Sequence, residues 1–174
     1  MPALSVNLPF SLDRTVTSPL AWPSDDELLV AIAGIHVGEH RLCQLANELG
    51  QLHDQLLAYD LARPDDPQTE DASPRAEIDW RRDELIFEID VWVAERAPIP
   101  HRNAGLHTET IGAVIDRLAQ TQTHASHLLM TLDAADPRVH AAWSHLAELA
   151  NGYTDLTADI LARSRRLPTR KDHR

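Results

Sequence analysis

Apolar residues recur at alternating spacings of four and three positions through most of this 174-residue chain. That spacing places them on one face of an α-helix, whereas a half-buried strand needs an apolar residue at every second position. Prolines divide the periodic sequence into four segments, and none of these follows the strand pattern. The sequence therefore predicts four amphipathic helices and an all-α fold.

The first periodic segment begins after Ser24, which forms a capping-box sequence with Glu27 three residues later. We expect one continuous helix of about nine turns that ends between Tyr59 and Ala62, ahead of Pro64. The predicted inward face consists of Leu28, Ile32, Ile35, Glu39, Leu42, Ala46, Leu49, His53 and Leu56.

Three more helices are predicted over residues 74–97, 109–132 and 137–166. The first of these begins at Pro74 after the cap Ser73, and the last begins at Pro137 after the cap Asp136. The middle one follows the cap Thr108. The short links between them favour an antiparallel four-helix bundle. The expected organisation is an extended, proline-containing N-terminal arm (1–23), a helical bundle (24–166) and a basic C-terminal tail (167–174).

Composition narrows the classes of function. The net charge of −11 argues against a general nucleic-acid binder, because phosphate contacts need a basic surface. The single cysteine, Cys43, excludes an internal disulfide and an all-cysteine metal site. No apolar run is long enough to cross a membrane and no signal-peptide pattern is present, so the cytoplasm is the expected location. The first predicted helix is longer than the others, and its overhang is where a second copy would pair in a homodimer.

The densest cluster of polar residues occupies positions 107–118, with the sequence His-Thr-Glu-Thr-Ile-Gly-Ala-Val-Ile-Asp-Arg-Leu. It begins the third predicted helix, yet it holds several charged side chains within three turns. Glu109 lies in the first turn, where the helix dipole favours a carboxylate. Gly112 is unusual inside a helix, where glycine costs about 1 kcal/mol relative to alanine. Either close packing of a neighbouring helix or room for a ligand accounts for this glycine.

This run resembles the signature of the bacterial DUF4254 family, His-Thr-Glu-Thr-x-Gly-x-x-Ile-Asp-Arg-Leu. Two weaker similarities are Arg82 to Asp90, which resembles the family's Arg-Asn-Asp-Leu-Ile segment, and Ile35-His36, which resembles the start of its Leu-His-x-x-Asn stretch. The resemblance covers roughly residues 28–165. It implies a helical bacterial protein and implies nothing about a reaction or a substrate.

The chain departs from the family pattern on the first predicted helix. Glu39 stands where the family has asparagine, Cys43 stands where it has tryptophan, and Ala46-Asn47 replace its Glu-Asp pair. These differences put any ligand chemistry shared through that helix in question.

Glu39 and Arg82 both occupy inward positions of predicted helices. A buried carboxylate costs several kcal/mol unless it is paired or protonated. One interpretation is therefore a structural Glu39–Arg82 ion pair. The other makes Glu39 a general base or ligand whose pKa the arginine sets.

The sequence His36-Val37-Gly38-Glu39-His40 matches the short motif of inverted zinc peptidases, in which a helix places both histidines on one face. His124 and His127 are a second candidate pair, three positions apart on the third predicted helix. The Glu-x-x-His repeats of di-iron bundles are missing, so half-buried or surface histidines are the favoured interpretation. A metal site built from these four histidines is the alternative, and no motif identifies a cofactor.

Two hypotheses of different classes follow. In the first, a polar pocket between the helices binds or acts on a small polar or anionic molecule. Glu39, His107 and Glu109 are its candidate catalytic residues, and His36, Arg82, Asp116 and Arg117 are its candidate ligand-binding residues. In the second, the chain is a non-catalytic interaction or dimerisation module whose inward charges are structural ion pairs. The first hypothesis requires a cleft that solvent reaches, and the second requires sealed ion pairs with an exposed apolar patch elsewhere.

Overall fold

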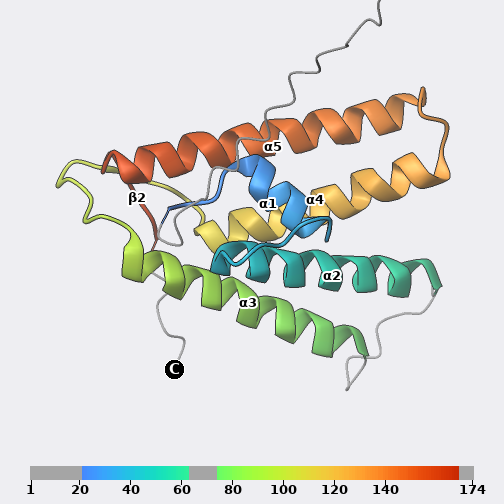
Figure 1. Cartoon of the computed structure of the whole chain (residues 1–174), viewed down its shortest axis with the longest axis horizontal. Coiled ribbons are helices and arrows are strands. Elements are labelled where there is room, and N and C mark those ends of the chain that lie inside the picture. Colours follow the sequence, from blue (N-terminus) through green and yellow to red (C-terminus); the bar gives the residue numbers. More distant parts are fainter. Residues whose placement is uncertain (1–20, 63–73, 169–174) are drawn as a thin grey trace, which may run out of the picture.

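The computed structural model describes residues 21–62 and 74–168, which form five helices and two very short strands (Figure 1). The all-α class predicted from the sequence is confirmed. Most of the predicted N-terminal arm and basic tail lies outside the described residues. The elements are α1 (Asp25–Ile32), α2 (Arg41–Ala62), α3 (Pro74–Arg96), β1 (Gly105–Leu106), α4 (Ile111–Thr131), α5 (Pro137–Leu161) and β2 (Arg165–Arg166).

The first predicted helix is in fact two helices, so the prediction of one continuous helix from Leu28 to about Tyr59 is wrong. The capping box at Ser24 and Glu27 starts α1 as expected. After eight residues the chain ends α1 in a Schellman motif, in which Ile35 N–H donates to Val30 O and Gly34 N–H donates to Ala31 O. Gly34 has a φ of +69°, a conformation that glycine adopts without steric cost.

The C-terminal end of α1 packs tightly against α2 and α4. The Asn47 amide donates to Ala31 O at 2.9 Å, and the Gln122 amide donates to Leu29 O at 2.9 Å. At Gly50, a Cβ atom would lie 2.4 Å from the carbonyl oxygen of Ile32. Side chains of two other helices and a close backbone approach therefore hold the last turn of α1 in place.

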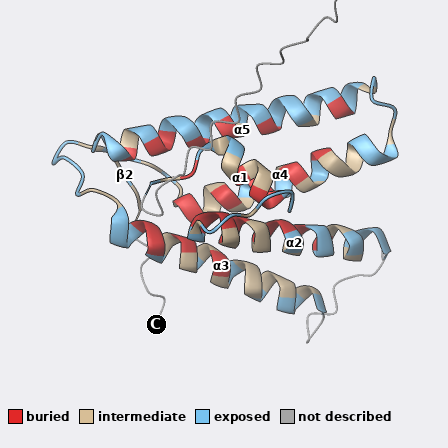
Figure 2. Ribbon diagram, in the orientation of Figure 1, coloured by how far each residue is buried: buried red, intermediate tan, exposed pale blue. Residues whose placement is uncertain are grey.

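Helix α4 is central, with contacts to α1, α2, α3 and α5. In the described part of the chain the backbones of α2 and α5 do not approach each other closely, and α1 contacts both and lies between them (Figure 1). Buried residues occupy the helix faces that point into the molecule (Figure 2). The largest fully buried side chains are Tyr153, Leu28, Leu42, Leu45, Leu49, Leu85, Ile89, Ile111, Ile115 and Leu118.

Tyr153 ties the start of the described chain to α5, because its hydroxyl donates to the carbonyl oxygen of Pro23 at 2.9 Å. Burial raises the pKa of this hydroxyl, so it stays a neutral donor. None of the described helices combines the length with the hydropathy that crossing a bilayer requires.

A two-residue parallel pairing fixes the connection between α3 and α4. Gly105 and Leu106 of β1 pair with Arg165 and Arg166 of β2. His107 N–H extends the pairing by donating to Arg166 O at 2.9 Å. The residues that lead into α4 are therefore held against the residues that follow α5.

Replacing Gly50 with alanine is expected to lower the free energy of unfolding by roughly 2–3 kcal/mol, because the new methyl group meets backbone rather than a flexible side chain. Gly152 is the matched control, since it is a helical glycine with nothing within 4 Å of an added Cβ. Gly152→Ala should raise the stability by about 0.8 kcal/mol through helix propensity. Urea denaturation measures both, and equal effects would contradict the close contact of α1 with α2.

Cys43 is expected to be unreactive in the folded protein. Its side chain is 5% exposed, and burial, with a smaller contribution from the charge of Glu27, raises its pKa to about 11. The thiol is therefore protonated at pH 8, and only the thiolate is nucleophilic. Titration with a thiol reagent at pH 8 should show slow modification in buffer and rapid modification in urea. Fast reaction in buffer would show that the helix packing around Cys43 is looser than described.

Candidate functional site

Three helices each contribute one residue to a buried polar cluster. The carboxylate oxygen Oδ1 of Asp116 (α4) accepts a hydrogen bond from His53 Nε2 (α2) at 2.8 Å. The same oxygen lies 3.1 Å from Arg82 Nε (α3). His53 is 5% exposed and Asp116 is 14% exposed, so the carboxylate is largely shielded from water. Asp116 therefore connects α2, α3 and α4 through one atom.

The geometry of this cluster also shows which atoms donate and which accept. A carboxylate only accepts, so His53 Nε2 carries the hydrogen and Nδ1 is the free acceptor in the neutral ring. Arg82 Nη1 donates to Asp79 Oδ1 at 3.0 Å, which gives the guanidinium a second carboxylate. Arg82 Nε lies within ion-pair distance of Asp116 but is poorly aligned for a hydrogen bond, so their attraction is chiefly electrostatic.

A pocket of about 370 Å³ adjoins this cluster, and we call it the polar pocket. Residues of α2, α3, α4 and α5 line it, and most of them carry polar side chains. They are His53, Leu56, Leu57, Asp60, Arg75, Arg82, Gln120, Thr121, Thr123, His124, Ala142 and His145. Arg75 is ion-paired with Asp60, and the Thr123 hydroxyl donates to Asp54 at 3.0 Å. The volume lies within the range of small-molecule sites.

The structure brings only part of the predicted site together. Arg82 and Asp116 meet, and His53 completes the cluster, although of these three only Arg82 and His53 line the polar pocket. Glu39 does not join them, because it lies in the irregular segment between α1 and α2 and is exposed. The predicted inward position of Glu39 and its predicted pairing with Arg82 are therefore wrong. His36, in the same segment, is exposed as well.

Three other predicted site residues lie at the start of α4, and their contacts are local. Arg117 forms an ion pair with Glu109 at the surface. The His107 ring holds the backbone of Glu109, with Nδ1 3.2 Å from its amide nitrogen. Thr110, and not the predicted Thr108, caps α4 by accepting a hydrogen bond from Ala113 N–H at 3.2 Å.

Gly112 is explained by close packing of two helices. A Cβ at this position would lie 2.4 Å from Ile86 O and 2.7 Å from Asp90 Oδ1. The Asp90 carboxylate accepts from Gly112 N–H at 2.8 Å, where the first turn of α4 has no intrahelical partner for that group. Of the two interpretations of this glycine, the structure supports close packing of a neighbouring helix and not room for a ligand.

The four histidines of the metal alternative do not form a shared site in the described residues. The segment 36–40 is not helical, so the peptidase motif lacks the helix that would align its two histidines. His40 Nδ1 accepts from Leu42 N–H at 3.2 Å and Nε2 donates to Ala21 O at 2.6 Å, which occupies both ring nitrogens. His124 lines the polar pocket, whereas His127 does not. The described residues contain no group of three or more side chains placed to bind a metal ion.

Sequence reasoning missed His53, Arg75, Thr121 and His145 as residues of the pocket. His53 had a usable signal, since it stands between Leu49 and Leu56 on the apolar stripe of α2. An imidazole at an inward position needs a partner, and Asp116 is the partner. Arg75 and His145 had no such signal, because they lie on exposed or half-exposed faces.

Asp116→Asn is expected to lower the free energy of unfolding by about 2–3 kcal/mol, because Arg82 loses a shielded counter-charge and His53 loses a charged acceptor. Asp83→Asn on the exposed face of α3 is the control and should change the stability by less than about 0.5 kcal/mol. Thermal and urea unfolding measure both variants. Similar small effects would show that the cluster contributes little to folding.

Comparison with known proteins finds one family, whose function is unknown. The sequence profile of the family described as "Protein of unknown function (DUF4254)" matches residues 51–169. No curated protein and no solved structure matches the chain. The matched region spans the whole of α3, α4 and α5 and the C-terminal half of α2, and it includes His53, Arg82 and Asp116. The chain belongs to the DUF4254 family.

Proposed function

We propose that the polar pocket binds a small anionic molecule, such as a carboxylate or a phosphate. The observation that carries this proposal is the convergence of two arginines and three histidines, from four helices, on one open pocket. Basic residues are the minority in a chain with a net charge of −11, so five of them around one pocket create a local surface that attracts anions.

Hydrogen-bond donors are in excess in the pocket. Asp60 is its one lining carboxylate, and that group is paired with Arg75. Arg82 is paired with Asp79 and Asp116, yet a guanidinium has five N–H groups and the contacts described occupy no more than two of them. The carboxylates therefore balance the charges of the arginines without using up their donors. A ligand that supplies several acceptor oxygens is the best match for the donors that remain.

His53 is the best-placed residue for acid–base chemistry on such a ligand. It lines the pocket, and its Nε2–H is held by a shielded carboxylate in the manner of a histidine and its orienting aspartate. Orientation by Asp116 leaves Nδ1 as the ring's available base. His53 takes the general-base role that the sequence had suggested for Glu39 or His107, and Arg82 holds negative charge on the ligand.

Inorganic phosphate and malonate are suitable probes for the two kinds of anion. Titration calorimetry on the whole chain should detect binding of at least one of them. The double variant His124→Gln/His145→Gln should weaken that binding about tenfold or more, since each imidazole contributes a hydrogen bond to a charged ligand. Both side chains are exposed, so the fold should be unaffected.

The matched control is the double variant His127→Gln/His140→Gln, which changes two histidines on the same two helices outside the pocket. It should bind as the unmodified chain does. Absence of binding at millimolar concentrations of both anions, or equal losses in the two double variants, would overturn the proposal.

A second candidate function is a helical interaction or dimerisation module. The observation that favours it is the ion pair of Arg82 with the shielded carboxylate of Asp116, since this hypothesis requires inward charges to be paired. The exposed apolar side chains of α3, which include Trp80 and Phe87, would then be covered by a partner. Light scattering on the purified chain distinguishes a monomer from a homodimer.

A further inference from the structure

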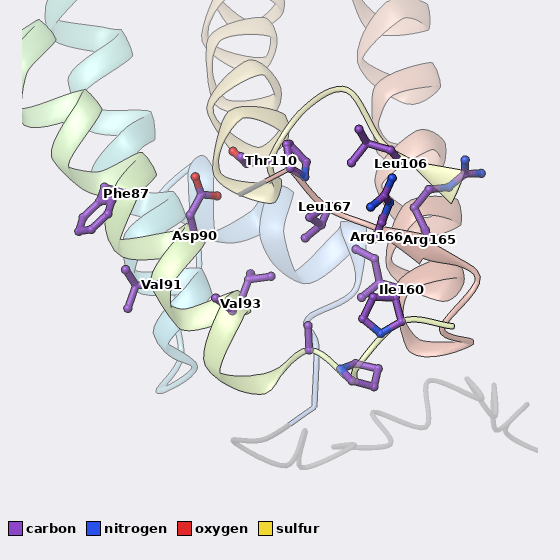
Figure 3. Close-up of a pocket in the computed structure, with 15 residues that line it drawn as sticks. Phe87, Asp90, Val91, Val93, Leu106, Thr110, Ile160, Arg165, Arg166 and Leu167 are labelled. Atoms are coloured by element: carbon purple, nitrogen blue, oxygen red, sulfur yellow. The ribbon is translucent and has the colours of Figure 1, made fainter. Parts of the chain in front are cut away.

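A second cavity, of about 740 Å³, lies at the end of the molecule where β1 pairs with β2, and we call it the apolar groove (Figure 3). The C-terminal half of α3, the connection to α4 and residues 160–168 form it. Most of its lining is apolar and includes Phe87, Val91, Val93, Leu106, Ile160 and Leu167. No residue of this groove lines the polar pocket, so the two sites are independent.

Large apolar side chains are left in contact with water along the groove. Phe87 is 48% exposed, Val91 is 39% exposed and Leu106 is 54% exposed. Large apolar side chains exposed around one cavity often mark a site for a ligand or a partner. Its concave shape and its volume match the cavities that bind small molecules.

The two basic residues that line the groove lie on one side of it. Arg165 and Arg166 lie on the same side as Leu106, and Phe87 and Val91 lie on the opposite side (Figure 3). Arg165 donates to Asp159 at 2.8 Å, which leaves it partly neutralised. Arg166 is exposed and forms no ion pair with any residue in the described part of the chain. Its backbone is fixed by the pairing with β1, so its side chain extends from a defined point at this side of the groove.

The acidic residue of the groove, Asp90, lies on the α3 side, away from Arg166 (Figure 3). Asp90 accepts from Gly112 N–H at 2.8 Å, which directs one carboxylate oxygen toward the N-terminus of α4. The groove therefore has an apolar side and a cationic side. A ligand that matches both must carry a hydrocarbon part and an anionic head.

We propose that the apolar groove binds a free alkyl carboxylate, with its chain along α3 and its head at Arg166. Burial of each added methylene should tighten binding about fourfold until the groove is filled. The carboxylate should also bind more tightly than the alcohol of equal length, because only the carboxylate meets the guanidinium with a charge.

Calorimetric titration of the whole chain with carboxylates from hexanoate to dodecanoate, and with the matched alcohols, tests the proposal. Arg166→Gln should weaken carboxylate binding about tenfold and leave alcohol binding unchanged. Arg138→Gln, at the distant start of α5, is the charge-matched control and should change neither. Val91→Asp should abolish binding of the longer chains, whereas Met130→Asp, at an exposed position outside the groove, should not.

Several outcomes would overturn the proposal. Affinity that does not rise with chain length, or equal binding of carboxylates and alcohols, contradicts the division into an apolar and a cationic side. If the chain dimerises, binds no carboxylate and becomes monomeric on Val91→Asp, the groove is an interface between two copies. If the chain binds anionic vesicles and no free carboxylate, the groove is a membrane-contacting surface.

Discussion

The close approach of helix backbones at two glycines governs the rest of this structure. At Gly50 the carbonyl of Ile32 occupies the place of a side chain, and at Gly112 the carbonyl of Ile86 does the same. Such contacts bring helix axes nearer than leucine-sized residues allow. One turn beyond Gly112, Asp116 is consequently close enough to α3 to meet Arg82 and close enough to α2 to meet His53. The polar cluster is thus a product of helix spacing as much as of charge.

The short helix α1 determines which part of the space between α2 and α5 is packed core and which part is left as the polar pocket. It lies between α2 and α5, whose backbones do not approach each other closely in the described part of the chain, and it supplies Leu28 and Ala31 to the core. The polar pocket adjoins other parts of these helices, between His53 and Asp60 on α2 and near His145 on α5. A continuous first helix would have carried the chain away from the space that α1 now fills.

The sequence was a good guide to helix position and a poor guide to helix continuity. Caps and prolines located the starts of α1, α3 and α5, because those signals act over a few residues. The break after Ile32 was missed because Ile35 and Glu39 kept the spacing of the stripe, although both proved exposed. Gly34 and Gly38, both at positive φ, were the overlooked signs. The error mattered for the site, since it had placed Glu39 beside Arg82.

One residue of the cluster was predictable for a physical reason. Arg82 stood at a predicted inward position, where a charge must find a partner, but its partners are Asp116 and Asp79 rather than Glu39. Arg75 and His145 line the pocket from half-exposed or exposed positions, where a charge can be solvated by water and needs no partner. Only the coordinates could therefore reveal them.

The pairing of β1 with β2 has a consequence for how the chain acquires this shape. Gly105 meets Arg165, a residue sixty positions later, after two long helices have intervened. During synthesis the stretch ahead of α4 must wait, without its hydrogen-bonding partner, until the residues of β2 have left the ribosome. Its final closure is a contact between distant parts of the chain, and contacts of this kind form late because of the entropy lost in closing a long loop.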